Sequence, residues 1–182
     1  MPRNLIAVAI ATAAVAAGCS GHPSPEQPAT DGPMRLTGDE LIVCMPLKGS
    51  KGHYTFAMTA LNNRGDRPLR VTAVTPVNPR NLRLTDIDIT FSEDGLFGNS
   101  TQWPPDSATN PRNSASWKAR KPATEVDIPT DPPEGVYNLL VHVVSDPGTR
   151  DASLDALDVD YTVNGKRYRT RTTISLRLKP AC

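Results

Sequence analysis

Hydrophobic and polar residues alternate along much of the second half of the chain. From Tyr168 to Leu178, every even-numbered position holds Tyr, Thr, Ile or Leu, and every odd-numbered position holds Arg, Thr or Ser. Successive side chains of a β-strand point to opposite faces, so a period of two is typical of a strand with one face in a core. The pattern therefore predicts one long strand over residues 168–178.

A second alternating run covers residues 157–163, and Asn164-Gly165 lies between the two runs. Both residues accept the positive φ that a two-residue type I′ turn requires, so we predict a β-hairpin. The turn sets the register, and the predicted cross-strand pairs are Val163–Lys166, Tyr161–Tyr168, Asp160–Arg169 and Asp158–Arg171. Opposite charges meet on one face in this register, and we interpret them as a solvated sheet face rather than as an ionic site.

Five further segments are predicted to be strands, over residues 41–45, 54–61, 69–75, 81–91 and 136–144. Within 81–91 the hydrophobic residues switch from even to odd positions, which predicts a β-bulge near Thr85. The segment 136–144 is almost continuously apolar and should be a central strand. No stretch shows helical periodicity or an internal repeat.

The lead-in to the apolar strand, Pro132-Pro133-Glu134-Gly135-Val136-Tyr137, resembles the Pro-x-Gly-x-Tyr segment before a late strand in immunoglobulin-like and fibronectin-like domains. Many short strands separated by Gly, Pro and Asn turns favour the same architecture. We therefore expect an all-β fold, an antiparallel immunoglobulin-like β-sandwich over residues 40–182. The charges nearly cancel, with 20 Lys plus Arg against 19 Asp plus Glu, which argues against a nucleic-acid partner.

The N-terminus begins with one basic residue, Arg3, and continues with an apolar run from Leu5 to Ala17. The run is too short to cross a bilayer, which needs roughly 20 residues, and is typical of a secretory signal peptide. Ala16-Ala17-Gly18-Cys19 resembles the lipobox of bacterial lipoproteins, although Leu is commonest where Ala16 stands. The resemblance implies a signal peptide over 1–18, lipidation of Cys19, and a cell-membrane protein on the extracytoplasmic side.

The three cysteines agree with this location. With Cys19 lipidated, Cys44 and Cys182 are left as a pair, and an exported protein meets oxidising conditions in which a disulfide persists. Residues 19–39 are rich in Pro, Gly and small polar side chains, so we expect a lipidated N-terminus followed by a disordered tether.

Candidate catalytic and metal-binding residues are few. His53 and His142 are not near a nucleophile motif, and we interpret His142 as a histidine satisfied within a sheet. Asp86 and Asp88 could suggest calcium, but they alternate with Ile87 and Ile89, as on the solvated face of a strand. The sequence therefore predicts no cofactor, no metal site and no enzyme.

Residues 92–121 lack periodicity but include Phe97, Trp103 and Trp117, which are both tryptophans and one of the three phenylalanines of the chain. Loops of this length are usually functional or disordered, and disordered segments carry few aromatics. One interpretation is that the loop folds back and a tryptophan plugs the core; the other is that these residues bind a protein or glycan. We thus expect a non-enzymatic accessory or interaction module of the envelope, with a carbohydrate-binding module for cell-wall polysaccharide as the alternative.

Overall fold

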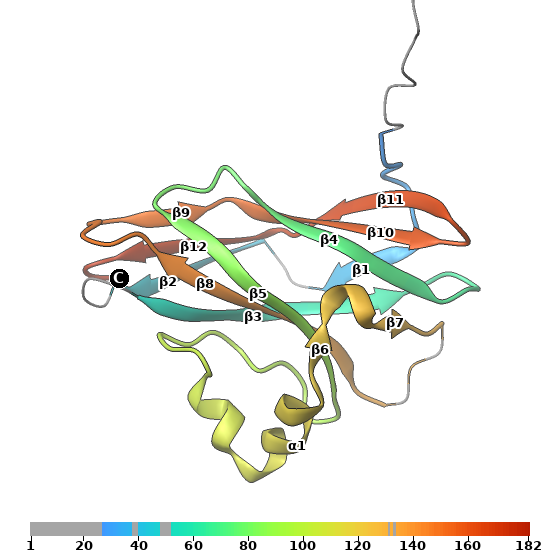
Figure 1. Ribbon diagram of the computed structural model, residues 1–182, viewed down its shortest axis with the longest axis horizontal. Coiled ribbons are helices and arrows are strands. Elements are labelled where there is room, and N and C mark those ends of the chain that lie inside the picture. Colours follow the sequence, from blue (N-terminus) through green and yellow to red (C-terminus); the bar gives the residue numbers. More distant parts are fainter. Residues whose placement is uncertain (1–26, 38–39, 48–51, 131, 133) are drawn as a thin grey trace, which may run out of the picture.

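The computed structural model describes residues 27–37, 40–47, 52–130, 132 and 134–182. Figure 1 shows stacked β-sheets, with a partly helical loop below them. The predicted signal peptide (1–18) and Cys19 lie outside the described residues. In the part of the chain that is described, no helix has the length and apolar character needed to span a membrane.

The first sheet has five antiparallel strands in the order β1-β3-β8-β5-β6. Their bounds are β1 Met34–Thr37, β3 His53–Asn63, β8 Val136–Ser145, β5 Leu82–Ser92 and β6 Lys121–Pro122. The predicted central strand is confirmed as β8, which lies between β3 and β5. The predicted bulge is confirmed as well, because the register of β5 against β8 shifts between Leu84 and Ile87.

The second sheet has the order β11-β10-β4-β7, with bounds β11 Lys166–Arg171, β10 Ala156–Val163, β4 Leu69–Val77 and β7 Asp127–Ile128. All four predicted cross-strand pairs of the β10–β11 hairpin are present. Asn164 and Gly165 have φ angles of 48° and 78°, as the predicted turn requires. The local turn chemistry was sufficient to define this register.

The third sheet has the order β2-β12-β9, with bounds β2 Leu41–Pro46, β12 Ile174–Lys179 and β9 Ala152–Leu154. It corrects two predictions. The expected long strand over 168–178 is two strands in different sheets, because the backbone turns at Thr172, whose Oγ1 accepts a hydrogen bond from the Leu157 N–H at 2.8 Å. In addition, β2 runs parallel to β12, so the fold is not antiparallel throughout.

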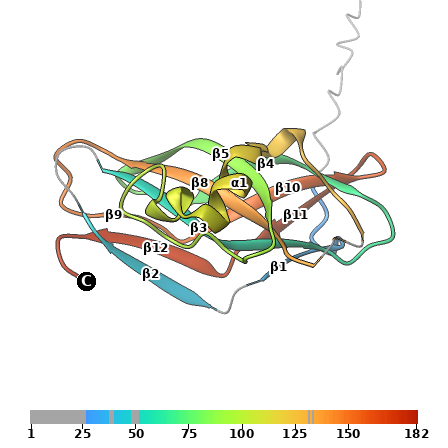
Figure 2. The same cartoon turned by 90° about the horizontal axis from the view of Figure 1, so that it is seen from below.

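The predicted disulfide is confirmed. Cys44 on β2 is bonded to Cys182 near the end of β12, with their Cα atoms 5.8 Å apart and a sequence separation of 138. The parallel pairing of β2 and β12, visible at one edge of Figure 2, brings the two cysteines together.

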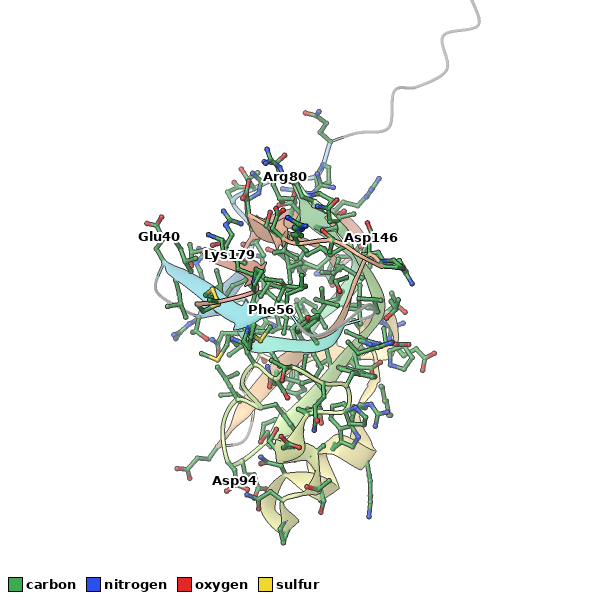
Figure 3. The ribbon with its side chains drawn as sticks, turned by 90° about the vertical axis from the view of Figure 1, so that its left-hand side faces the viewer. Glu40, Phe56, Arg80, Asp94, Asp146 and Lys179 are labelled. Carbon is green, nitrogen blue, oxygen red and sulfur yellow. A yellow bond between two sulfur atoms is a disulfide. The ribbon has the colours of Figure 1, made fainter. Side chains whose placement is uncertain are left out.

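The core is filled by side chains from all three sheets. In Figure 1 the four-stranded sheet lies over the five-stranded one, and Figure 3 shows Phe56 in the middle of the packed side chains. The fully buried contributors include Tyr54, Phe56, Val71, Val141, Tyr161 and Leu176. Burial of this apolar surface is the main stabilising contribution, at roughly 25 cal/mol per Å². The all-β prediction is confirmed.

The predicted tether is wrong for residues 27–37, which belong to the folded domain. Met34 is 1% exposed, and its N–H donates to the Tyr161 hydroxyl at 3.1 Å. Ala29 pairs with the backbone of β11, and Arg169 N–H donates to the Ala29 carbonyl at 2.8 Å. A Cβ on Gly32 would lie 2.1 Å from the Tyr161 hydroxyl oxygen, so only glycine permits this approach. Composition alone did not show these long-range contacts.

The segment predicted as a loop over 92–121 contains two short helices. They are the 3₁₀-helix η1, Asp106–Thr109, and the α-helix α1, Pro111–Ala119, and a second 3₁₀-helix, η2 (Ala123–Glu125), follows β6. The α1 sequence PRNSASWKA has no apolar stripe, which is why no helical period was visible. In Figure 1 this segment lies on the side of the five-stranded sheet away from the core.

Candidate functional site

The loop is attached to the five-stranded sheet through the backbone of β3, along the part of its edge that β1 does not cover. Ser100 and Thr55 exchange two backbone hydrogen bonds of 2.9 and 3.0 Å, and the Gly98 N–H donates to the Ala57 carbonyl at 3.2 Å. The buried Thr55 hydroxyl donates to the Gln102 carbonyl at 2.7 Å. These bonds fix residues 98–102 and thereby position Trp103, the next residue.

A small apolar cluster, separate from the main core, holds the loop from inside. It consists of Ala57, Phe97, Ala108, Trp117 and Leu140, with Trp103 packed against it. The Trp117 side chain is 8% exposed and lies 5.9 Å from the Phe97 ring, between centroids. The loop therefore folds back onto the protein, but Trp117 covers the outer face of the sheet together with Phe97, and the expected plugging of the core by a tryptophan is not observed.

Trp103 is only partly buried, and it lies flat on a histidine. Its ring and that of His142 on β8 are 4.7 Å apart with an interplanar angle of 3°. The edge of Trp103 meets Trp117 at 5.1 Å and 70°. Of the two tryptophans, Trp103 is therefore the more exposed one.

His142 is the middle member of a hydrogen-bonded chain across three strands. Its Nδ1 lies 2.6 Å from the Asp86 Oδ2 on β5, and its Nε2 lies 2.9 Å from the His53 Nδ1 on β3. His142 is 7% exposed, whereas His53 and Asp86 reach the surface. The hydrogen bond from His142 lowers the pKa of Asp86, so this side chain is a carboxylate at neutral pH.

Asp88, two residues further along β5, forms an ion pair with Arg120 at 3.1 Å. Burial raises the pKa of Asp88, and the neighbouring guanidinium opposes that shift. Arg120 also lies over the Trp117 ring at 4.1 Å, in a cation–π contact. The prediction of a solvated strand face is therefore wrong for Asp88 and only partly right for Asp86, because both carboxylates bind residues that the loop covers or provides.

The two histidines were treated separately at the level of sequence, and their contact was missed. His53 is opposite Val144 in the β3–β8 ladder, so its ring reaches His142 diagonally, with the ring centroids 5.1 Å apart. The pairing of 53–61 with 136–144 would have been the necessary signal, and a bulge between Phe56 and Thr59 obscures that register in the sequence.

Within the described ranges, no group of three or more His, Cys, Asp or Glu side chains is arranged to hold a metal ion. A separate groove of about 470 Å³ lies between α1 and the end of β5. Its floor includes Phe91 and Tyr137, and its rim carries both Lys121 and Glu125. Charges of both signs on the rim do not specify one class of ligand.

Comparison with known proteins gives little further information. No protein-family model matches the chain, and no curated protein matches it. Among solved structures, a protease of Vibrio cholerae, VesB, matches 81% of this chain and 32% of its own length, with 11% sequence identity and a TM-score of 0.39. The chain thus corresponds to about a third of that protein, and a likeness this distant carries no argument about activity.

This comparison nevertheless corrects one prediction. The sequence-based prediction that the chain is not an enzyme is withdrawn: the match named above is a protease, and at a TM-score of 0.39 it neither supports nor excludes activity in this chain. Catalysis is therefore neither assigned to this chain nor excluded.

Proposed function

We propose that the protein is an envelope lipoprotein, anchored in the cell membrane by lipid on Cys19, whose immunoglobulin-like domain is an interaction module on the extracytoplasmic side. The observation that carries the proposal is the combination of a lipobox-like Ala16-Ala17-Gly18-Cys19 with a disulfide between the other two cysteines. Disulfides persist in oxidising compartments, so the bridge supports export, and export supports the anchor.

The loop over 92–121 is the proposed recognition surface. It lies on the outside of the sheet, and Leu96, which is 37% exposed, is among its apolar residues. Partly exposed tryptophans held rigidly by their neighbours are favourable anchors for a protein partner, because little conformational entropy is lost on binding. Trp103 meets this description.

A glycan-binding module receives less support. A sugar ring is bound on a flat, exposed aromatic surface, and two coplanar indoles would provide it. Trp103 and Trp117 meet at 70°, and Trp117 is buried. A protein partner therefore fits the geometry of the loop better.

The anchor is tested by Cys19→Ala in intact cells. We expect the variant to leave the membrane fraction or to remain unprocessed, and to incorporate no labelled palmitate. Ser20→Ala, which keeps the cysteine, is the matched control and should be processed and retained as the wild type is. Normal membrane retention of Cys19→Ala would contradict the anchor.

The recognition surface is tested by placing a photo-cross-linking amino acid at Leu96 and, as a control, at the exposed Arg80. Figure 3 shows Arg80 on the side of the molecule opposite Asp94, which belongs to the loop. We expect a specific envelope protein to be cross-linked from position 96 and not from position 80. The same products from both positions, or no product from position 96, would contradict the proposed surface.

A further inference from the structure

The chain Asp86–His142–His53 lies beneath the loop and has capacity for one more proton. Because the Asp86 carboxylate can only accept, the Nδ1 of His142 carries a proton and donates it across 2.6 Å. With both histidines neutral, the Nε2 of His142 accepts from the Nδ1 of His53 across 2.9 Å. One added proton reverses this second bond without breaking it: His142 becomes a cation that donates from both nitrogens, and His53 accepts.

Both ring nitrogens of His142 face atoms that can accept a hydrogen bond from a protonated ring. The Asp86 carboxylate on β5 accepts from its Nδ1, and His53 on β3 can accept from its Nε2. Asp88, two residues further along β5, is paired with Arg120 after α1. The loop contributes the uncharged Trp103 ring, stacked on His142 at 4.7 Å. Asp86, Asp88 and Arg120 together carry one net negative charge, and protonation of His142 brings the total to zero. The His142 cation then lies against the face of the Trp103 indole, which attracts it.

We propose that His142 is a proton-operated latch: its protonated ring holds Trp103, and with it the loop over residues 98–110, more tightly on the sheet than its neutral ring does. Docking of Trp103 and binding of the proton strengthen each other, since coupling between two binding events is reciprocal. The loop is therefore held more tightly as pH falls and less tightly as pH rises. Histidine is the side chain that ordinarily changes its charge between about pH 5 and 8, which sets the pH range of the test.

This inference goes beyond the proposed function, because it concerns the loop's attachment to its own sheet and does not require a partner or a lipid. The test uses the purified full chain in detergent, with hydrogen exchange of the 98–106 backbone amides measured from pH 8 to pH 5 and corrected for intrinsic exchange rates. We expect protection to increase in one step by roughly three- to fivefold, the size of one cation–π contact at a partly exposed position. The Trp103 indole N–H resonance should shift over the same step.

Three variants test whether His142 and Asp86 are responsible for the step. His142→Gln should abolish the pH-dependent step in protection. Asp86→Asn should move the step to lower pH, and because Asp86 is exposed, this variant provides a test even if His142→Gln folds poorly. Asp94→Asn, an exposed carboxylate on the same loop, is the matched control and should leave the step unchanged. The latch is refuted if protection stays constant or decreases on acidification, or if Asp86→Asn behaves as Asp94→Asn does.

Discussion

The β10–β11 hairpin and the loop over 92–121 are built by opposite means. The hairpin is specified locally: a two-residue turn fixes six cross-strand pairs between neighbours in the sequence. The loop is specified at a distance, because Thr55, Asp88 and His142, from three different strands, hold it. A segment without hydrophobic periodicity can therefore be well ordered when the side chains of a sheet provide it with hydrogen bonds, ion pairs and ring contacts.

The largest loss of stability is expected from removal of the disulfide, because the covalent ring that it closes contains both the hairpin and the loop. Cys44→Ala combined with Cys182→Ala should lower the free energy of unfolding by about 3–5 kcal/mol, because the bridge closes a long chain segment in the unfolded state. Denaturant unfolding followed by circular dichroism and by tryptophan fluorescence measures it. The two signals should fall together; a separate, earlier fluorescence transition would show that the loop unfolds independently of the sheets.

The next effect concerns the two tryptophans. Trp117→Ala empties the middle of the loop cluster and should cost about 3 kcal/mol. Trp103→Ala, at the partly exposed position, should cost about 1 kcal/mol and should abolish cross-linking from position 96. Thermal unfolding of both variants checks this. Equal losses of stability would show that Trp103 is as structural as Trp117 and would remove it from the recognition surface.

A smaller effect is expected in the hairpin turn. Gly165 has a φ of 78°, and a Cβ there costs about 1–2 kcal/mol in the left-handed region. Gly165→Ala should therefore destabilise the domain by that amount, while Asn164→Gly, which keeps positive φ accessible, should change the free energy of unfolding by much less. If Gly165→Ala were neutral, the turn would not be what sets the register.

The smallest effect is expected from the charged face of the hairpin. The hydrogen bond from Arg171 to Asp158 lowers the pKa of this carboxyl, so the pair stabilises the folded state above the usual Asp value near 3.9 and loses that contribution as pH falls below it. Because Arg171 is exposed and the pair is screened by solvent, Arg171→Gln should lower the free energy of unfolding only slightly at pH 7, by less than the turn substitution does. At pH 2 the variant and the wild type should unfold alike, and a cost that persists there would have another origin.

Sequence reasoning was most successful where structure depends on neighbours. The hairpin register, the bulge in β5 and the central strand β8 follow from alternation and turn residues. It failed where a residue's partner is remote: the pairing of 27–37 with the sheets, the parallel β2–β12 ladder, and the His53–His142 contact. The tryptophans could be selected because they are rare, but nothing local shows that one is buried and the other stacks on a histidine.

The disulfide also determines how the domain responds to mechanical load. Cys44 and Cys182 close one covalent ring that contains every described strand except β1 and the first residues of β2. A pull applied to the chain before Cys44 and to Cys182 is carried through the sulfur–sulfur bond, so the strands inside the ring are not extended. Strand β1 is held to β3 by hydrogen bonds at the edge of the sheet. This strand and the preceding segment around Ala29, which pairs with β11, would detach under such a pull, while the tryptophan loop inside the ring keeps its shape.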